Sequence, residues 1–173
     1  MRLSLENIHK VREEILNLAL RHIVFDGWCW KALNAAGKVF NVDLLTLKRA
    51  FPKGPQDLVS YFCDRADKLM LDELCEMDMS SIPVRERIET AIEVRLRQNS
   101  HNREAIRKLL SYFVIPNNIM SGVGFTYQTV DGIWYAAGDT STDYNFYTKR
   151  GLLAGIYSST ILYLSLIHIS EPT

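Results

Sequence analysis

The clearest indication of the fold is the stretch NVDLLTLKRAFPKGPQDLVSYF, residues 41–62 of a chain of 173 residues. Asp43 can cap a short helix, because its carboxylate can accept the unpaired amide protons of the first helical turn. That helix is predicted to cover residues 44–50, and Pro55 is favourable at the start of a longer helix that runs to about Met77. The stretch therefore predicts a short helix, a tight connection and a long helix.

Ahead of this stretch, apolar residues recur at helical spacing. A first helix is predicted over residues 5–22, and Asp26 is expected to cap a second helix that turns Val39 inward. The long helix after Pro55 is expected to bury Leu69. Because no segment of the chain alternates with period two, the predicted fold class is all-α.

Behind the stretch, residues 80–83 mark the predicted boundary between two halves, residues 1–80 and 81–164. Pro83 is expected to open a helix with Val84 on its buried side and a solvated Arg/Glu face opposite. A helix is predicted over residues 102–114, and another, which Gly122 and Gly124 weaken or bend, begins at Pro116. That helix is expected to end at Ala137–Asp139. A last helix is expected to begin with a Thr140-x-x-Asp143 capping box.

The composition excludes some classes of protein. The 20 Lys and Arg residues balance 20 Asp and Glu residues, whereas a protein that binds nucleic acid with its whole body carries a basic excess. Cys29, Cys63 and Cys75 match neither a disulfide framework nor a Cys-x-x-Cys pair. No apolar run reaches the length of a membrane-spanning helix, and the first residues carry no recognisable targeting signal.

The short helix after Asp43, preceded by another helix and a tight turn, has the layout of a DNA-binding helix-turn-helix. Base reading needs Arg, Lys, Asn or Gln at the start of such a helix. Here Leu44 and Leu45 occupy those positions, and Lys48 and Arg49 come late. Operator binding and a retained scaffold without DNA recognition both stay open, and the leucines favour the scaffold.

Two parts of the sequence resemble known families. Residues 5–70 are similar to the helix-turn-helix corner of the TetR family. The segment VDGIWYAAGDTSTDYNFYTKRGLLAGIYSST, residues 130–160, resembles the TetR-like ubiquinone-biosynthesis accessory family, lipid-binding proteins that partner the demethoxyubiquinone hydroxylase. The matches at Phe25–Trp28, Ala50–Pro52, Arg87–Ile88 and Arg95–Leu96 extend the second resemblance over about residues 8–164.

The family resemblance implies a TetR-like helical bundle and a homodimer without catalytic activity. It implies that an apolar cavity of the C-terminal half takes up an isoprenoid quinone intermediate or a phospholipid and presents it to the hydroxylase at the inner membrane. The location would be the matrix side in a mitochondrion or the cytoplasmic side in a bacterium. The family motif places Tyr147, and Phe146 where the family has Trp, in the docking patch for the hydroxylase. It places Arg150 near a lipid head group.

The candidate lipid-binding residues are Ile133, Trp134, Tyr135, Lys149, Arg150, Leu153 and Tyr157. Helical spacing puts Phe146, Lys149, Arg150 and Leu153 on one face, and a cation beside aromatic residues suits a phosphate head group. The same residues allow a plainer interpretation, in which Arg150 pairs with an acid such as Asp143 and the aromatic residues are ordinary core.

Two further questions have more than one answer: the role of a strip of small residues and the function of the whole chain. Gly151, Ala154 and Gly155 form a strip that could lie at a dimer seam or leave room for a ligand. Besides the lipid-presenting role, the chain could be a TetR-type DNA-binding regulator with a small-ligand pocket, or an interaction scaffold whose cavity is filled by its own side chains.

No catalytic residue, cofactor or metal site is predicted. Glu6-x-x-His9 has the spacing of half a di-iron carboxylate site, but the sequence holds no second copy. A Gly-rich phosphate loop and a nucleophile elbow are also absent from the sequence.

The last nine residues, SLIHISEPT at 165–173, resemble no part of the family. We interpret them as a non-native tail after a truncated domain. Family chains continue into an amphipathic helix that lies on the membrane, so this chain is expected to bind membranes weakly.

Overall fold

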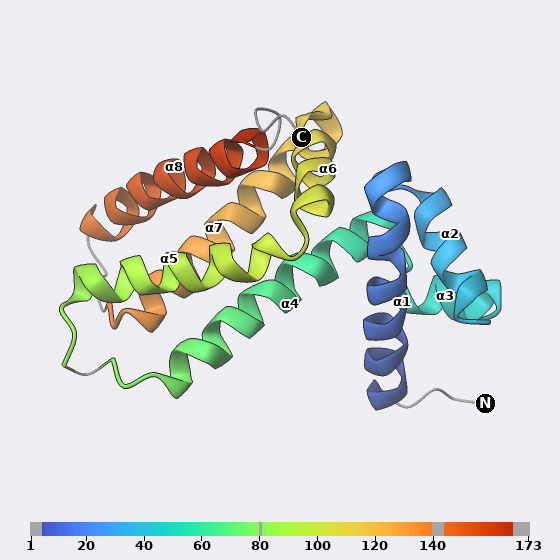
Figure 1. Cartoon of the computed structure of the whole chain (residues 1–173), viewed down its shortest axis with the longest axis horizontal. Coiled ribbons are helices and arrows are strands. Elements are labelled where there is room, and N and C mark those ends of the chain that lie inside the picture. The colour runs from blue at the N-terminus through green and yellow to red at the C-terminus, as the bar shows by residue number, and fades with distance from the viewer. Residues whose placement is uncertain (1–4, 80, 140–143, 168–173) are drawn as a thin grey trace. The chain divides into compact units, whose positions relative to one another are not determined.

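The computed structural model describes residues 5–79, 81–139 and 144–167. Within these ranges the regular elements are all helices, so the prediction of an all-α fold is confirmed (Figure 1). The elements are α1 (Leu5–Asp26), α2 (Trp30–Val39), α3 (Leu44–Ala50), α4 (Pro55–Glu76), α5 (Val84–Ser100), α6 (Arg103–Val114), the short 3₁₀ helix η1 (Pro116–Asn118), α7 (Ile119–Ala136) and α8 (Tyr144–Ile167).

The chain forms two compact units. The first, unit 1, is Met1–Asp64 with Glu104–Tyr112, and the second, unit 2, is Arg65–Arg103 with Phe113–Thr173. Helix α4 gives its first residues to unit 1 and its last residues to unit 2. These units group the residues differently from the halves 1–80 and 81–164, whose separate functions stay a prediction.

Unit 1 contains the predicted TetR-like front, in which the short helix α3 follows α2. Asp43 is the N-cap residue of α3 and Pro55 is the first residue of α4, as predicted. Contacts from distant parts of the chain hold this front together. The Arg12 Nε donates to the Ala50 carbonyl at 2.7 Å, and the buried Trp28 Nε1 donates to the Ala105 carbonyl at 2.9 Å.

The prediction that Asp26 caps the second helix is wrong. Asp26 is the last residue of α1, and Gly27 follows it with a φ of 76°, a left-handed conformation that ends helices and that glycine adopts easily. Helix α2 begins only at Trp30, after the N-cap Cys29. The Asp26 carboxylate instead pairs with Lys31 at 2.7 Å.

Three residues expected on buried faces are partly exposed. Val39 and Val84 lie at a helix end, where neighbouring helices cover less of the side chain, and are 62% and 46% exposed. Leu69 is 47% exposed, because Met70 takes the inward position. One step along a helix turns a side chain by about 100°, so both residues cannot face the core.

Helix α7 runs from Ile119 to Ala136 without interruption, so Gly122 and Gly124 do not break it, and the predicted weakening or bending stays a prediction. Glycine weakens a helix by only about 1 kcal/mol, and tertiary packing can outweigh that cost. At Gly122 the packing is visible, because a Cβ there would lie 2.8 Å from the Phe113 ring. This glycine therefore permits a close contact within unit 2.

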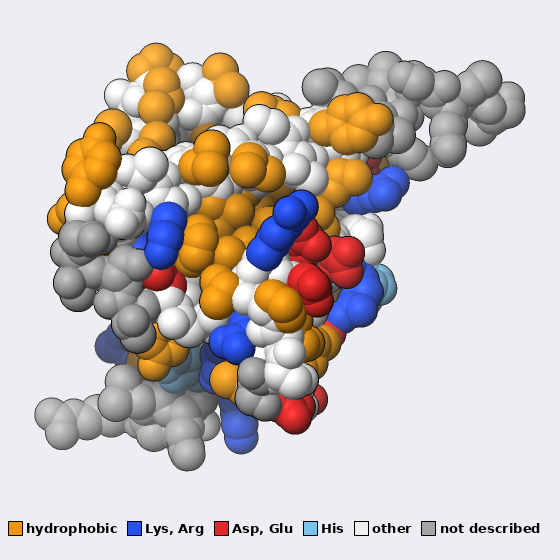
Figure 2. Space-filling view, turned by 90° about the vertical axis from the view of Figure 1, so that its left-hand side faces the viewer, with side chains coloured by type: hydrophobic (Ala, Val, Ile, Leu, Met, Phe, Trp, Pro, Cys, Tyr) orange, Lys and Arg blue, Asp and Glu red, His pale blue; other side chains and the backbone are white. Residues whose placement is uncertain are grey.

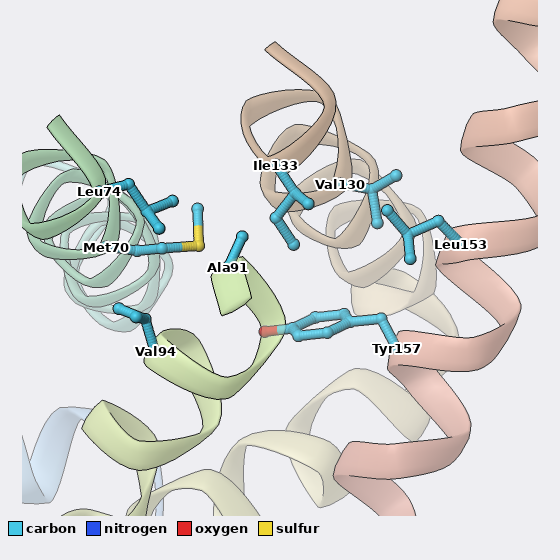
Figure 3. Close-up of a cluster of buried hydrophobic side chains, with 8 residues drawn as sticks. All are labelled: Met70, Leu74, Ala91, Val94, Val130, Ile133, Leu153 and Tyr157. Carbon is cyan, nitrogen blue, oxygen red and sulfur yellow. The ribbon is translucent and has the colours of Figure 1, made fainter. Parts of the chain in front are cut away.

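The core of unit 2 joins four helices. Its buried members come in pairs from α4, α5, α7 and α8, and their side chains point toward one another (Figure 3). They are Met70, Leu74, Ala91, Val94, Val130, Ile133, Leu153 and Tyr157. This core holds α7 and α8 beside each other as the hairpin that carries the candidate site.

Among the described residues, no helix combines the length and the apolar character that crossing a membrane would require.

Candidate functional site

The site is built on the turn that follows α7. Ala137 caps the helix, and Gly138 takes a φ of 84°, which an L side chain rarely adopts. The Asp139 amide then donates to the Trp134 carbonyl at 3.0 Å. This helix end lies where the sequence predicted it, and it brings the Asp139 carboxylate toward α8.

Arg150 of α8 is the centre of an ion cluster. Its Nε donates to Asp131 at 2.6 Å and its Nη1 donates to Asp139 at 3.2 Å. The Arg150 side chain is 5% exposed, as is the Asp139 side chain, whereas Asp131 is 47% exposed. Burial alone would lower the pKa of Arg150, but the two carboxylates outweigh it and raise that pKa. The guanidinium is therefore a permanent cation that ties α7 to α8.

Lys149 completes this cluster. Its Nζ contacts Asp139 at 3.0 Å and lies 5.3 Å from the centre of the Trp134 ring, in a cation–π arrangement. Two cations and two carboxylates thus balance one another. We call Asp131, Asp139, Lys149 and Arg150 the hairpin clamp.

Two aromatic residues, Phe146 and Tyr147, lie next to the clamp. The Phe146 ring is centred 3.4 Å from the Arg150 guanidinium carbon, and the Phe146 carbonyl accepts from Nη1 of the same arginine at 3.4 Å. The Phe146 and Tyr147 rings meet edge to face with centres 5.2 Å apart. Tyr147 is 69% exposed. Contact with Arg150 of the clamp therefore holds Phe146 in place, and Phe146 in turn contacts the exposed ring of Tyr147.

The predicted lipid-binding residues fall into three environments. Ile133, Leu153 and Tyr157 are packed in the unit 2 core, while Trp134, Lys149 and Arg150 lie at the clamp. Tyr135 points away from both and is 79% exposed. The structure therefore brings six of these seven residues together between the helices of the hairpin. Three of them lie in the unit 2 core and three lie at the clamp.

The plainer interpretation of Arg150, pairing with an acid, describes what the structure shows, although the acids are Asp131 and Asp139. The acid predicted as partner, Asp143, lies outside the described residues, as does the whole Thr140–Asp143 capping box. The head-group role of Arg150 stays a prediction.

The outer side of α8 forms a second feature of the site, which we call the α8 face. It comprises Tyr144, Asn145, Tyr147, Thr148, Gly151, Leu152, Gly155, Ile156, Ser159, Leu162 and Tyr163, all of them exposed. None of these residues is charged. Figure 2 shows hydrophobic side chains gathered over the upper part of that view, where α8 lies. Several exposed apolar side chains grouped on one side of a helix are typical of an interaction site.

Sequence reasoning missed a buried polar network in unit 2. The helix after Pro83 was expected to carry a solvated Arg/Glu face, but Arg95 is 5% exposed and pairs with the buried Asp67 at 3.1 Å. The Thr129 hydroxyl donates to the same carboxylate at 2.8 Å. One signal was available, since Arg95 lies four residues after the buried Ala91 and therefore on the apolar stripe of α5.

In the part of the chain that the structure describes, no three His, Cys, Asp or Glu residues come together in a way that could hold a metal ion. The Glu6 side chain, which belongs to the Glu6-x-x-His9 spacing noted in the sequence, lies outside the described side chains.

Comparison with known proteins points to one family. Residues 120–166, which comprise nearly all of α7 and α8, match the COQ9 family model. The chain is 30% identical over 165 residues to ubiquinone biosynthesis protein COQ9-A, mitochondrial, of Xenopus laevis, with 91% of the chain and 51% of that protein covered. It is 30% identical over 166 residues to the human COQ9 protein, again with 91% and 51% covered. For the Schizosaccharomyces pombe protein the values are 30% over 152 residues, with 87% and 60% covered.

The chain spans about half the length of the vertebrate relatives it matches. Their names place these relatives in ubiquinone biosynthesis and in mitochondria. The match to them covers both units, and the family model falls on the hairpin that carries the clamp and the α8 face. The chain is therefore similar to the COQ9 proteins along 91% of its length.

Proposed function

We propose that this chain acts in ubiquinone biosynthesis as a lipid-binding protein without catalytic activity. It binds an isoprenoid quinone intermediate or a phospholipid and presents it to the demethoxyubiquinone hydroxylase at the inner membrane, in mitochondria if the chain is eukaryotic. The observation that carries this proposal is the coincidence of the COQ9 match, residues 120–166, with the hairpin that holds the clamp and the α8 face.

The docking part of the proposal is supported by the aromatic pair. Tyr147 is exposed, and Phe146 beneath it is held by contact with the buried Arg150. An aromatic residue that is already ordered in the free protein loses little conformational freedom on binding, which favours affinity. Phe146 and Tyr147 would therefore form the centre of the hydroxylase contact.

A buried donor beside the clamp supports the lipid part of the proposal. The Trp134 Nε1 is buried, and among the described residues it finds no hydrogen-bond acceptor. Buried polar groups are normally paired, so an unpaired indole N–H calls for an explanation. A quinone carbonyl or a lipid head-group oxygen would accept this hydrogen bond, with Lys149 of the clamp next to it.

The isoprenoid tail would have to enter an occupied space. Ile133, Leu153 and Tyr157 pack against the residues of α4 and α5 in the unit 2 core, so a tail among them requires the helices to move apart. We propose that the tail lies along these side chains after such a movement. The head group would then stay at Trp134 and Lys149, with Arg150 as the fixed cation behind them.

We also propose that the chain forms a homodimer through the part of the α8 face around Gly151 and Gly155, which leaves Tyr147 at the start of the helix open to the hydroxylase. A Cβ added at Gly151 or Gly155 would meet no atom within 4 Å, so both glycines border open space. Small residues at this spacing let a second helix approach closely. A face without charges would lose little hydration when another copy covers it.

Mass spectrometry of lipids extracted from the purified chain tests the lipid role. The expected result is a co-purified quinone or phospholipid, with clearly less of it in Trp134→Phe, which keeps an aromatic ring but removes the N–H. The control variant is Trp30→Phe, at a half-exposed position of unit 1. Repeated absence of any lipid would contradict the proposal.

One observation favours a second candidate function, the interaction scaffold. Three of the seven predicted lipid-binding residues fill the unit 2 core with their own side chains. A scaffold would bind the hydroxylase through Tyr147 and carry no lipid. The lipid extraction separates the two functions, because only the first predicts co-purified lipid.

The remaining alternative, a DNA-binding regulator, predicts salt-sensitive binding to a palindromic operator. The structure gives it little support, because Leu44 and Leu45 are 58% and 57% exposed at the start of α3, where base-reading side chains would lie.

A further inference from the structure

Helix α3 presents a surface that the proposed function leaves unexplained. Its exposed residues are Leu44, Leu45, Lys48 and Arg49, whereas Leu47 and Ala50 face the unit 1 core. Leu44 and Lys48 are four residues apart, as are Leu45 and Arg49, so all four share one side of the helix. This α3 face therefore carries two leucines in its first turn and two cations in its second.

Four cations on and next to α3 form no ion pair with an acid among the described residues. Lys38 at the end of α2 and Lys53 after α3 are exposed like Lys48 and Arg49. None of these four side chains forms an ion pair or a hydrogen bond among the residues that the structure describes, and only one acid, Asp43, lies between Lys38 and Lys53 in the sequence. In a chain of zero net charge, this corner is locally basic.

Apolar side chains are exposed at the same corner. Val39 is 62% exposed at the end of α2, next in sequence to Lys38, and Leu44 and Leu45 are exposed to a similar extent. Duplex DNA offers phosphates to cations but no apolar phase that would bury three aliphatic side chains. A bilayer with anionic lipids offers both, because leucines can enter the acyl boundary while cations stay at the phosphates.

We propose that the α3 face, with Val39, Lys38 and Lys53, is a contact surface for an anionic membrane. Leu44, Leu45 and Val39 enter the interface, and the four cations bind lipid phosphates. This inference goes beyond the proposed function and does not depend on it, because the surface lies in unit 1, away in sequence from the hairpin of unit 2.

Vesicle flotation with the whole chain tests the proposal. The vesicles contain either equal parts of phosphatidylglycerol and phosphatidylcholine or phosphatidylcholine alone. The unmodified chain is expected to prefer the anionic vesicles. Lys48→Gln/Arg49→Gln should weaken that binding about thirtyfold, since each of the two cations near an anionic surface contributes roughly 1 kcal/mol. Leu44→Gln/Leu45→Gln should weaken it by a similar factor through lost apolar burial.

Two control variants match these changes in unit 2. Lys68→Gln/Arg103→Gln removes two exposed cations, and Leu69→Gln/Val84→Gln removes two partly exposed apolar side chains. Both should bind anionic vesicles like the unmodified chain. Circular dichroism shows that each variant is folded, which is expected because the replaced side chains are exposed.

The proposal is overturned if the α3 variants bind anionic vesicles like their controls. It is also overturned if Lys48→Gln/Arg49→Gln abolishes binding to a DNA duplex while the unmodified chain ignores the vesicles. Lipid extraction from the same variants separates this proposal from the quinone role. A co-purified quinone without α3-dependent flotation contradicts only the α3 contact, and α3-dependent flotation without a quinone contradicts only the quinone role.

Discussion

The α3 face and the α8 face both expose apolar side chains on a helix, but they differ in charge. On α3, two exposed leucines are followed one turn later by Lys48 and Arg49. The α8 face carries aliphatic, aromatic, small and uncharged polar residues and no charge. A charged phosphate surface suits the first face, and a protein surface or a second copy suits the second. The difference shows that exposed apolar area alone does not indicate the partner.

The two faces also differ in their support. Beneath the α3 face, Leu47 and Ala50 are held by apolar packing. Beneath the α8 face, Arg150 is held by Asp131 and Asp139. An ion cluster fixes direction as well as distance, because guanidinium hydrogen bonds follow a planar geometry. We therefore expect the orientation of Phe146 and Tyr147 to depend on the clamp.

Replacing Arg150 by Met should have the largest effect. It leaves the buried Asp139 with Lys149 as its remaining clamp cation and removes the contact beneath Phe146, so the free energy of unfolding should fall by about 2–3 kcal/mol. Urea denaturation followed by circular dichroism measures this change. Arg85→Met is the control, because the Arg85–Glu89 pair is exposed and should contribute less than about 0.5 kcal/mol. Equal values for the two variants would show that the clamp does not stabilise the hairpin.

Raising the salt concentration should weaken vesicle binding by the α3 face much more than hydroxylase binding by the α8 face, and we expect an effect of intermediate size. Raising the salt concentration from about 0.1 M to about 1 M shortens the screening length from roughly 10 Å to 3 Å. Flotation with anionic vesicles through the α3 face should fall by about thirtyfold or more over this range, because screening acts on all four cations of that surface. Capture of the hydroxylase through the uncharged α8 face should change little. Equal salt dependence of the two activities would contradict the comparison.

Replacing Lys149 by Met should have the smallest effect. Lys149 is 39% exposed, and Asp139 keeps its contact with Arg150 when Lys149 is lost. The free energy of unfolding should fall by about 0.5 kcal/mol, as for other partly exposed pairs. A loss as large as that of Arg150→Met, measured in the same urea titration, would mean that Lys149 and not Arg150 holds the hairpin.

Local signals predicted much of the fold, because helix ends are determined by nearby residues. Asp43, Pro55 and the Ala137–Gly138 end of α7 all lie where the sequence placed them. Asp26 was placed wrongly because Gly27 can end a helix as readily as an acid can begin one. The signal for a helix start at Asp26 and the signal for a helix end at Gly27 lie on neighbouring residues, and the structure follows the second.

The candidate site was harder to predict, because its contacts join residues of different helices. The pairing of Arg150 with Asp131 and Asp139 depends on how α8 lies against α7, which helical spacing within α8 does not give. The exposure of Tyr135 was within reach of sequence reasoning. It lies two residues after the buried Ile133, about 200° around the same helix, so the two cannot face one cavity.

Capture of purified demethoxyubiquinone hydroxylase by the immobilised chain tests most directly the claim that the α8 face presents a docking surface. Tyr147→Lys places a charge on that face at an exposed position, so it should lower capture at least tenfold without changing stability. The matched control is Phe25→Lys, which changes an exposed aromatic residue of unit 1 and should capture normally. Equal capture by Tyr147→Lys, Phe25→Lys and the unmodified chain would contradict the claim.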